Sequence, residues 1–195
     1  MSIGRPAVFF DRDGTLNEEV DFLRSPEELR LIPGAARAVH SVNAVGMRTC
    51  IISNQSGIAR GFLTEADLIP IHAKLEHELS IEGARIDAIY YCPHHPTEGL
   101  PPYNVTCECR KPRPGMLRRA ERELSVDLTR SYVIGDRTVD IRVGQAVGGR
   151  GILVLTGYGV TAREECRQEG IIPDFIAASV VEAVDFVLVD RKRGN

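Results

Sequence analysis

The sequence predicts an α/β fold with a doubly wound, mostly parallel Rossmann-like sheet and helices on both faces. Two observations support this prediction. Short apolar runs rich in Val, Ile, Phe and Tyr alternate with longer segments of helical period, and such alternation is typical of α/β sheets. The apolar runs are also mostly continuous, which indicates strands buried on both faces.

The strand candidates are the five apolar runs at residues 7–10, 49–53, 86–91, 131–134 and 151–155. Helix candidates fill the gaps. The segment 33–45 begins with proline and is followed by glycine, an asymmetry typical of helices. Thr64 and Ser179 each have an acidic residue three positions later, which is the capping-box pattern of a helix start. Further helices are expected over 114–124 and 140–147.

Length and composition bound the organisation. The chain has 195 residues, of which 43% are hydrophobic and 26% charged. These values are ordinary for a globular protein and exclude collagen, a disordered tail and a membrane-embedded chain. At about 150 residues per domain, we expect a single domain over 1–195. Two stretches, 17–32 and 92–114, interrupt the strand–helix alternation, and neither suffices for a separate domain.

Charge and hydropathy limit the partners. The net charge of −3, from 24 basic and 27 acidic residues, is too mild to indicate a nucleic-acid surface. The apolar run near the N-terminus is short, whereas a signal peptide needs about 7–15 apolar residues and a membrane span about 18. We therefore expect a cytoplasmic monomer that acts on a small molecule, with neither nucleic acid nor membrane as a partner.

Two acids follow the first strand, in Phe-Phe-Asp-Arg-Asp-Gly-Thr at residues 9–15. Ligands of open α/β sheets bind beyond the carboxyl ends of strands, where Asp11 and Asp13 would share a small volume. Two such carboxylates repel unless a cation is present or one is protonated, and Mg²⁺ suits carboxylate and carbonyl oxygens. One acid could attack phosphorus while the other transfers a proton. A surface Asp-x-Asp-Gly turn is the alternative.

Three further polar groups follow in order. Ser53 closes the second strand and offers a hydroxyl to a phosphoryl oxygen. Lys111 lies just before a predicted helix and supplies a compact positive charge. Asp136 ends the fourth strand, and Asp140 lies one helical turn later. Each of these alone is typical of a solvated surface.

In combination, the acid pair, hydroxyl, lysine and further acid resemble the haloacid dehalogenase superfamily of phosphatases over roughly residues 7–160. The resemblance implies a capless version of that fold. It implies that Asp11 is the nucleophile, forming an aspartyl-phosphate, and that Asp13 is the general acid and base. It also implies that Ser53 and Lys111 hold the transferring phosphoryl group.

The same resemblance implies catalytic Mg²⁺ bound by Asp11, by the backbone carbonyl of Asp13 and by Asp136, with Asp140 in support. A cation is needed because a phosphate dianion and the Asp11 carboxylate repel each other. The repulsion is about 4 kcal/mol at about 4 Å and an effective dielectric constant of about 20. Mg²⁺ and Lys111 would reverse that sign in the transition state.

A second cluster of candidate ligands lies in the loop 92–109. The expected ligands of a structural Zn²⁺ are Cys92, His94, Cys107 and Cys109. His95 is the alternative to His94. A disulfide between the last two cysteines would close a very small strained ring, and inert thiols are the other alternative. Zinc would fix the proline-rich loop where it delivers Arg110 and Lys111 to the phosphate site.

The remaining cysteines and histidines are not expected to bind metal or to take part in catalysis. Cys50 lies inside a predicted strand and is expected to be buried and inert. Cys166 lies in a polar stretch and has no assigned role. His40, His72 and His77 are expected in helices, as surface or core residues rather than catalytic ones.

Three stretches, 53–61, 91–96 and 109–116, resemble a tighter group, the heptose bisphosphate phosphatases, whose nearest relative is the histidinol-phosphate phosphatase domain. The resemblance implies removal of the C7 phosphate of a heptose 1,7-bisphosphate for nucleotide-activated heptose synthesis, with contacts to the distal part of the substrate from Arg110 and Arg137. The expected substrate-binding residues are Glu19, Val20, Asp21, Phe22, Ser53, Asn54, Gln55, Ser56, Arg110, Lys111 and Arg137.

Other functions fit the residues less well. A histidinol-phosphate phosphatase would bind a cationic amine, which Arg110, Lys111 and Arg137 would repel. A phosphate-binding or aspartyl-phosphorylated signalling domain without turnover would not need Asp13 as an acid. A zinc-structured interaction module leaves the four ordered motifs unexplained.

Overall fold

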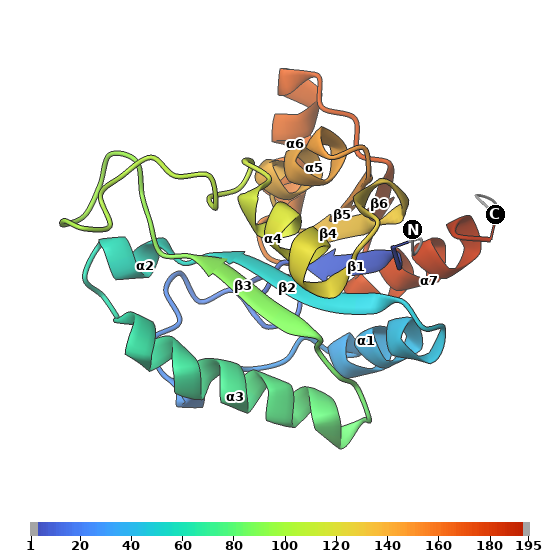
Figure 1. Cartoon of the computed structure of the whole chain (residues 1–195), viewed down its shortest axis with the longest axis horizontal. Coiled ribbons are helices and arrows are strands. Elements are labelled where there is room, and N and C mark those ends of the chain that lie inside the picture. The colour runs from blue at the N-terminus through green and yellow to red at the C-terminus, as the bar shows by residue number, and fades with distance from the viewer. Residues whose placement is uncertain (1–3, 193–195) are drawn as a thin grey trace.

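Six parallel strands form one sheet in the order β3-β2-β1-β4-β5-β6 (Figure 1). The computed structural model describes residues 4–192, so the ends of the predicted domain, 1–3 and 193–195, lie outside the described residues. The strands are β1 Ala7–Phe10, β2 Arg48–Asn54, β3 Ala88–Cys92, β4 Tyr132–Gly135, β5 Arg150–Val154 and β6 Phe175–Ala177. All neighbouring pairs are parallel, and the predicted fold class is confirmed.

The direction of winding changes between β1 and β4. From β1 the chain builds outward through β2 and β3, and it then returns to the other side of β1 for β4, β5 and β6. A switch of this kind opens a crevice at the carboxyl ends of the two central strands, which is where open α/β sheets bind ligands.

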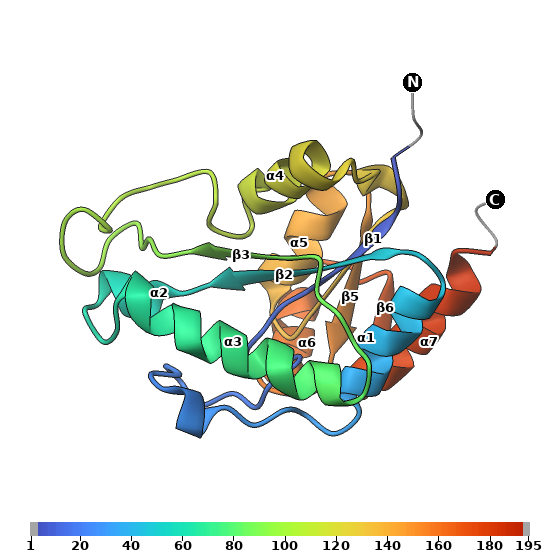
Figure 2. The same ribbon diagram turned by 60° about the horizontal axis from the view of Figure 1, so that its bottom comes forward.

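Helices cover both faces of the sheet (Figure 2). They are α1 Ala35–Ala44, α2 Ser56–Ala59, α3 Glu65–Ile81, α4 Gly115–Leu124, α5 Thr138–Ala146, α6 Gly159–Glu169 and α7 Val180–Asp190. Val8 and Phe10 point to the core under α1, α3 and α7, whereas Ala7 and Phe9 point to the core under α4 and α5. This period-two alternation explains why the whole first strand is apolar.

Two elements near the β6 edge of the sheet, β6 and α6, were not predicted from the sequence. Strand β6 is short, and its position depends on the stacking of Phe175 on Phe186 of α7, with ring centroids 4.4 Å apart. Helix α6 has three buried residues, one of them Cys166, so its apolar period is weak. Cys166 is therefore buried despite its polar neighbours in the sequence.

Helix and strand boundaries shift by a few residues from the predicted ones. The largest shift among the strands is at β3, which begins at Ala88 because Asp87 instead caps the start of β2, accepting from the backbone N–H of Thr49 at 2.9 Å. The capping box of Thr64 is present in both halves. Ser179 accepts from the Glu182 N–H, while the Glu182 carboxylate accepts from the Ala178 N–H.

The two interruptions lie at the carboxyl end of the sheet. Residues 17–32 carry a single turn of 3-10 helix, Pro26–Glu28. The stretch 93–114 runs as a long loop beyond α2 in both views (Figures 1 and 2) and contains no helix or strand apart from an isolated bridge between His95 and Asn104. Within residues 4–192, no helix is both long and apolar enough to cross a membrane.

Candidate active site

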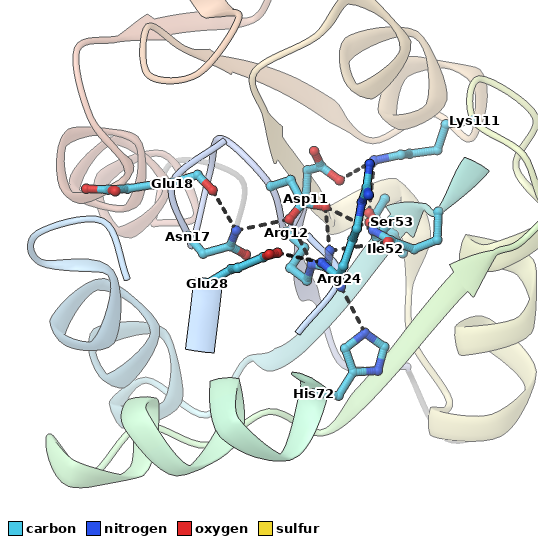
Figure 3. A network of polar contacts seen from close by, with 12 residues as sticks. Asp11, Arg12, Asn17, Glu18, Arg24, Glu28, Ile52, Ser53, His72 and Lys111 are labelled. Atoms are coloured by element: carbon cyan, nitrogen blue, oxygen red, sulfur yellow. Dashed lines mark hydrogen bonds and ion pairs between the residues drawn. The ribbon is translucent and has the colours of Figure 1, made fainter. Parts of the chain in front are cut away.

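Asp11 lies at the switch between the two halves of the sheet. It follows β1 directly, and its N–H donates to the carbonyl of Ile134 in β4 at 2.8 Å. Lys111 reaches it from the loop before α4, with Nζ 2.7 Å from a carboxylate oxygen of Asp11 (Figure 3). The same ammonium lies 2.6 Å from Asp140 and donates to the carbonyl of Ile52 at 2.9 Å. Lys111 is only 3% exposed, so its three partners fix its position.

Three carboxylates converge at this point. Ligand atoms of Asp11, Asp136 and Asp140 lie within 4.8 Å of one another, and all three residues are buried. Asp136 follows β4, and one of its oxygens accepts from the Tyr158 N–H at 2.8 Å. Its other oxygen is buried and has no hydrogen-bond partner in the described part of the chain. A buried carboxylate oxygen without a donor, beside a second carboxylate, fits a hard divalent cation such as Mg²⁺.

The pKa values of the clustered groups also fit a divalent cation. Burial raises the pKa of Asp11 to about 6, although Lys111 opposes that rise. Burial and the two neighbouring carboxylates raise the pKa of Asp136 to about 8. Burial alone would lower the pKa of Lys111, but Asp11 and Asp140 hold it above its usual value. One ammonium thus faces three acids, and a divalent cation would restore the balance.

Two glycines let the backbone approach this cluster. Gly14 has a φ of 78°, and a Cβ there would lie 2.2 Å from an oxygen of Asp136. A Cβ at Gly157 would meet the same oxygen at 2.2 Å. Both positions therefore require glycine to keep the space around Asp136 open.

Asp13 occupies a separate hydrogen-bonded environment. Arg12 donates to both of its oxygens, from Nε at 3.0 Å and from a terminal nitrogen at 2.8 Å. Asn17 and Gln55 donate the remaining bonds, at 3.0 and 2.9 Å. Burial alone would raise the pKa of Asp13, but these donors hold it below its usual value. Its carboxylate is not part of the three-acid cluster, so only its backbone carbonyl remains for the role expected of Asp13 at the metal.

The sequence reading did not single out Arg12. Its side chain is fully buried and donates to Asp13 and Gln55. It also approaches His72 of α3 (Figure 3). A guanidinium nitrogen lies 3.4 Å from Nε2 of His72. Burial, together with the charge of Arg12, lowers the pKa of His72 to about 4, so this ring is neutral and its Nε2 accepts. The hydrogen-bond partners of this buried arginine come from three separate parts of the chain. The spacing of these residues in the sequence does not show that they lie close together.

We expect His72 to make the stability of the fold depend on pH. Its pKa is about 4 in the folded protein and about 6.5 in the unfolded chain. The unfolded chain binds more protons between these values, so stability falls as the pH drops from 7 towards 4. At pH 5 the titration of His72 lowers the free energy of unfolding by about 2 kcal/mol. Urea denaturation at pH 7 and pH 5 measures it.

The matched variant is His72→Gln, whose amide oxygen can still accept from Arg12. Asp11 and Asp136 titrate in both proteins, and their effect cancels in the comparison. The unmodified protein should lose about 2 kcal/mol more than the variant between the two pH values. Equal losses would show that His72 does not carry this dependence.

The cysteines of the loop meet at one point. Sγ of Cys109 lies 3.2 Å from that of Cys92 and 3.3 Å from that of Cys107. Nδ1 of His94 lies 3.4 Å from Cys109 and 3.7 Å from Cys92. Tetrahedral zinc with metal–sulfur bonds of about 2.3 Å has edges of about 3.8 Å. A disulfide has sulfurs about 2.05 Å apart, and all described cysteines are free. The four side chains therefore fit zinc.

His95 does not join this cluster. Its Nδ1 accepts from the backbone N–H groups of Thr97 and Glu98, at 3.4 and 3.0 Å. His95 instead lines the cavity that opens above Asp11. Of the two histidines that the sequence left open, the geometry therefore favours His94.

A cavity of about 560 Å³ opens above Asp11. Ten of the eleven expected substrate-binding residues line it, namely Glu19, Asp21, Phe22, Ser53, Asn54, Gln55, Ser56, Arg110, Lys111 and Arg137. Val20 does not: it is 42% exposed and lines two shallower neighbouring pockets instead. Arg60 and Tyr158 also line the cavity and were not expected. Ser53 is buried, and its hydroxyl accepts from Gln55 at 2.6 Å.

Comparison with known proteins gives consistent matches. A family model described as HAD-hydrolase-like matches residues 108–183. A D-glycero-beta-D-manno-heptose-1,7-bisphosphate 7-phosphatase of Rhodopseudomonas palustris is 45% identical, over 74% of this chain and 80% of that protein. A D-glycero-D-manno-heptose-1,7-bisphosphate 7-phosphatase of Thermosynechococcus vestitus is 41% identical, over 94% of this chain and 95% of that protein.

A solved structure agrees. The D,D-heptose 1,7-bisphosphate phosphatase of B. bronchiseptica, crystallised with magnesium and phosphate, superposes with a TM-score of 0.82 at 32% identity. The match covers 95% of this chain and 99% of that one. Magnesium and phosphate are thus found together in a protein that shares this fold.

Proposed function

Because the chain belongs to the heptose 1,7-bisphosphate phosphatase family of the haloacid dehalogenase-like hydrolases, we propose that it removes the C7 phosphate of D-glycero-D-manno-heptose 1,7-bisphosphate. The product would be the heptose 1-phosphate used in nucleotide-activated heptose synthesis. One observation carries the proposal. The Asp11 carboxylate lines a cavity whose walls also carry Arg60, Arg110 and Arg137. Arg60 is paired with Glu98, whereas Arg110 and Arg137 form no ion pair among the described residues. These two are cations beyond the lysine that a single phosphate needs.

In the first half-reaction, Asp11 attacks phosphorus as its bond to the sugar oxygen breaks, giving an aspartyl-phosphate. Asp13 protonates the departing oxygen. Lys111 and the Ser53 hydroxyl hold the equatorial oxygens. In the second half-reaction, Asp13 takes a proton from water as that water attacks phosphorus. Phosphate leaves and the Asp11 carboxylate is restored. The donors around Asp13 favour its ionised form, which the second half-reaction requires. The first half-reaction requires the protonated acid, which the negative charge of a bound phosphate would favour.

The residues that would hold Mg²⁺ are Asp11, Asp136 and the backbone carbonyl of Asp13, with Asp140 in support through its ion pair with Lys111. When bound, the ion would offset the negative charge that the phosphoryl group brings to a cluster of carboxylates. The related structure, which contains magnesium and phosphate, supports this assignment.

The same proposal covers the rest of the molecule. Cys92, His94, Cys107 and Cys109 would hold structural Zn²⁺ with no open position. One catalytic domain would span residues 1–195 and act as a monomer. A reducing cytoplasm suits free thiols that bind metal.

A phosphate-release assay with Mg²⁺ tests the substrate. The panel comprises the α and β anomers of the heptose 1,7-bisphosphate, histidinol phosphate and simple sugar monophosphates. We expect the highest kcat/KM for one of the heptose bisphosphates. A higher value for histidinol phosphate would contradict the proposal and support the amine substrate.

Arg137→Ala should weaken hydrolysis of the bisphosphate more than that of a monophosphate. A hydrogen bond to a charged group contributes about 1.5–3 kcal/mol, so KM for the bisphosphate should rise roughly tenfold to a hundredfold. Arg122→Ala, on the last turn of α4 away from the cavity, is the control for loss of an arginine. Equal losses for both substrates would argue against a role for Arg137 in binding the second phosphate.

A further inference from the structure

The guanidinium of Arg137 rests on an aromatic ring rather than on a carboxylate. Its central carbon lies 3.8 Å from the centroid of the Tyr158 ring. Arg137 forms no ion pair within the part of the chain that the structure describes, although Asp21 and Glu19 line the same cavity. A cation over an aromatic face is attracted to the ring but keeps its full charge.

Tyr158 is itself fixed from two directions. Its backbone N–H donates to Asp136 at 2.8 Å, immediately before α6. Its hydroxyl donates to Asp21 at 3.1 Å. Asp21 adopts a left-handed conformation with a φ of 57°, which is uncommon for a residue other than glycine. Tyr158 thus joins the loop 17–32 to the segment that begins at Asp136.

This arrangement has a consequence for the charge of the cavity. Tyr158 satisfies Asp21 with its hydroxyl and supports Arg137 with its ring, so the acid and the base do not neutralise each other. Stacking leaves the edge of a guanidinium free, and that edge can form two parallel hydrogen bonds to a phosphate. The cavity thereby presents a cation that forms no ion pair, although its charge acts on nearby Glu19 and Asp136. This cation is separate from Lys111, which holds the phosphoryl group at Asp11.

We propose that Tyr158 is a specificity-determining residue that positions Arg137 to bind the second phosphate of a bisphosphate substrate. The inference rests on the proposed function, since it needs a substrate with two anionic groups. Tyr158 acts through Arg137 and makes no contact with the reacting phosphorus. A monophosphate that occupies only the Asp11 end of the cavity gains little from it.

Steady-state kinetics with two substrates test the inference. The measured quantity is the ratio of kcat/KM for the heptose 1,7-bisphosphate to that for p-nitrophenyl phosphate. Tyr158→Leu should lower this ratio about three- to tenfold, through KM for the bisphosphate. Tyr158→Phe keeps the ring and loses only the hydrogen bond to Asp21, so it should lower the ratio less than Tyr158→Leu does. Tyr158→Met is a second variant without a ring, for use if the leucine variant does not fold.

A double variant distinguishes positioning from general damage. If Tyr158 acts through Arg137, Arg137→Ala/Tyr158→Leu should lower the ratio no further than Arg137→Ala alone. Val160→Ala is the matched control, because Val160 lies in the same first turn of α6, is 58% exposed and does not line the cavity. It should leave the ratio as it is in the unmodified enzyme.

The outcomes separate the two proposals. Additive losses in the double variant, or a ratio that survives loss of the ring, would overturn the role of Tyr158 and leave the phosphatase assignment intact. An unmodified enzyme that does not prefer the bisphosphate over p-nitrophenyl phosphate would overturn both.

Discussion

Asp11→Asn should abolish phosphate release, with kcat reduced by roughly 10⁴-fold or more. An amide cannot form the aspartyl-phosphate, and Lys111 then has only Asp140 as an ionic partner. The fold should survive, because the variant removes one of three buried carboxylates that repel each other. Phosphate release with Mg²⁺, together with thermal denaturation, measures both effects. Substantial residual turnover by a well-folded variant would exclude Asp11 as the nucleophile.

Asp13→Asn is the informative companion to this variant. The amide oxygen that it introduces could still accept from Arg12, so the buried arginine would keep a partner. With p-nitrophenyl phosphate, whose leaving group needs no proton, Asp11 could still attack phosphorus, but water would lack its general base. We therefore expect a phosphoenzyme that accumulates and releases phosphate slowly. Rapid quenching and intact-protein mass spectrometry would detect the added phosphoryl group.

The same experiment distinguishes an enzyme from a signalling domain. A phosphoryl group that stays on the unmodified protein would indicate a domain that is phosphorylated without turnover. Covalent phosphate in Asp11→Asn but none in Asp13→Asn would reverse the proposed roles of the two acids.

Continuous apolar runs made most of the sheet predictable, because strands buried on both faces leave few polar positions. β6 has a weaker signal, because its run Phe-Ile-Ala is short and only Ala177 of it is buried. It pairs with β5 over three residues, and its placement depends on the stacking of Phe175 and Phe186, which is a tertiary contact. The helix before it, α6, is mostly polar because it packs on the sheet through few residues.

The candidate site shows a similar division. Asp11 and Asp136 each follow a strand, so sheet topology alone predicts that they meet. The zinc cluster was predictable because its residues lie in one loop and are of ligand type. Arg12 and His72 are 60 positions apart, and Tyr158 lies just before α6, a helix that was not predicted from the sequence. Contacts of this kind arise from how helices pack and have no spacing signature.

Cys107→Ala is expected to have the second-largest effect, through the position of Lys111. The next ligand, Cys109, is separated from Lys111 by one residue, and Arg110 between them donates to the His94 carbonyl at 3.0 Å. Loss of zinc should free this loop, lower kcat about tenfold to a hundredfold and lower the melting temperature. Cys166→Ala removes a buried thiol outside the cluster. It should keep both zinc and kcat. Metal analysis and kinetics on the two variants measure the difference.

A displaced Lys111 explains why a structural metal would affect the chemistry. Lys111 is held by Asp11 and Asp140, and its backbone is held by Asn54, which accepts from its N–H at 3.0 Å. Removing one partner from a buried ion pair costs about 3–5 kcal/mol, because a charge remains uncompensated. Lys111→Met removes the ammonium altogether and should therefore produce a kinetic defect at least as large as that of Cys107→Ala while retaining zinc.

Metal restoration tests the same dependence of Lys111 on zinc. After chelation of both metals, Mg²⁺ alone should restore little activity, because the loop would still fail to deliver Lys111. Zn²⁺ with Mg²⁺ should restore it. Full recovery with Mg²⁺ alone, or unchanged kinetics in a Cys107→Ala protein that has lost its zinc, would show that the loop holds Lys111 in place without the metal.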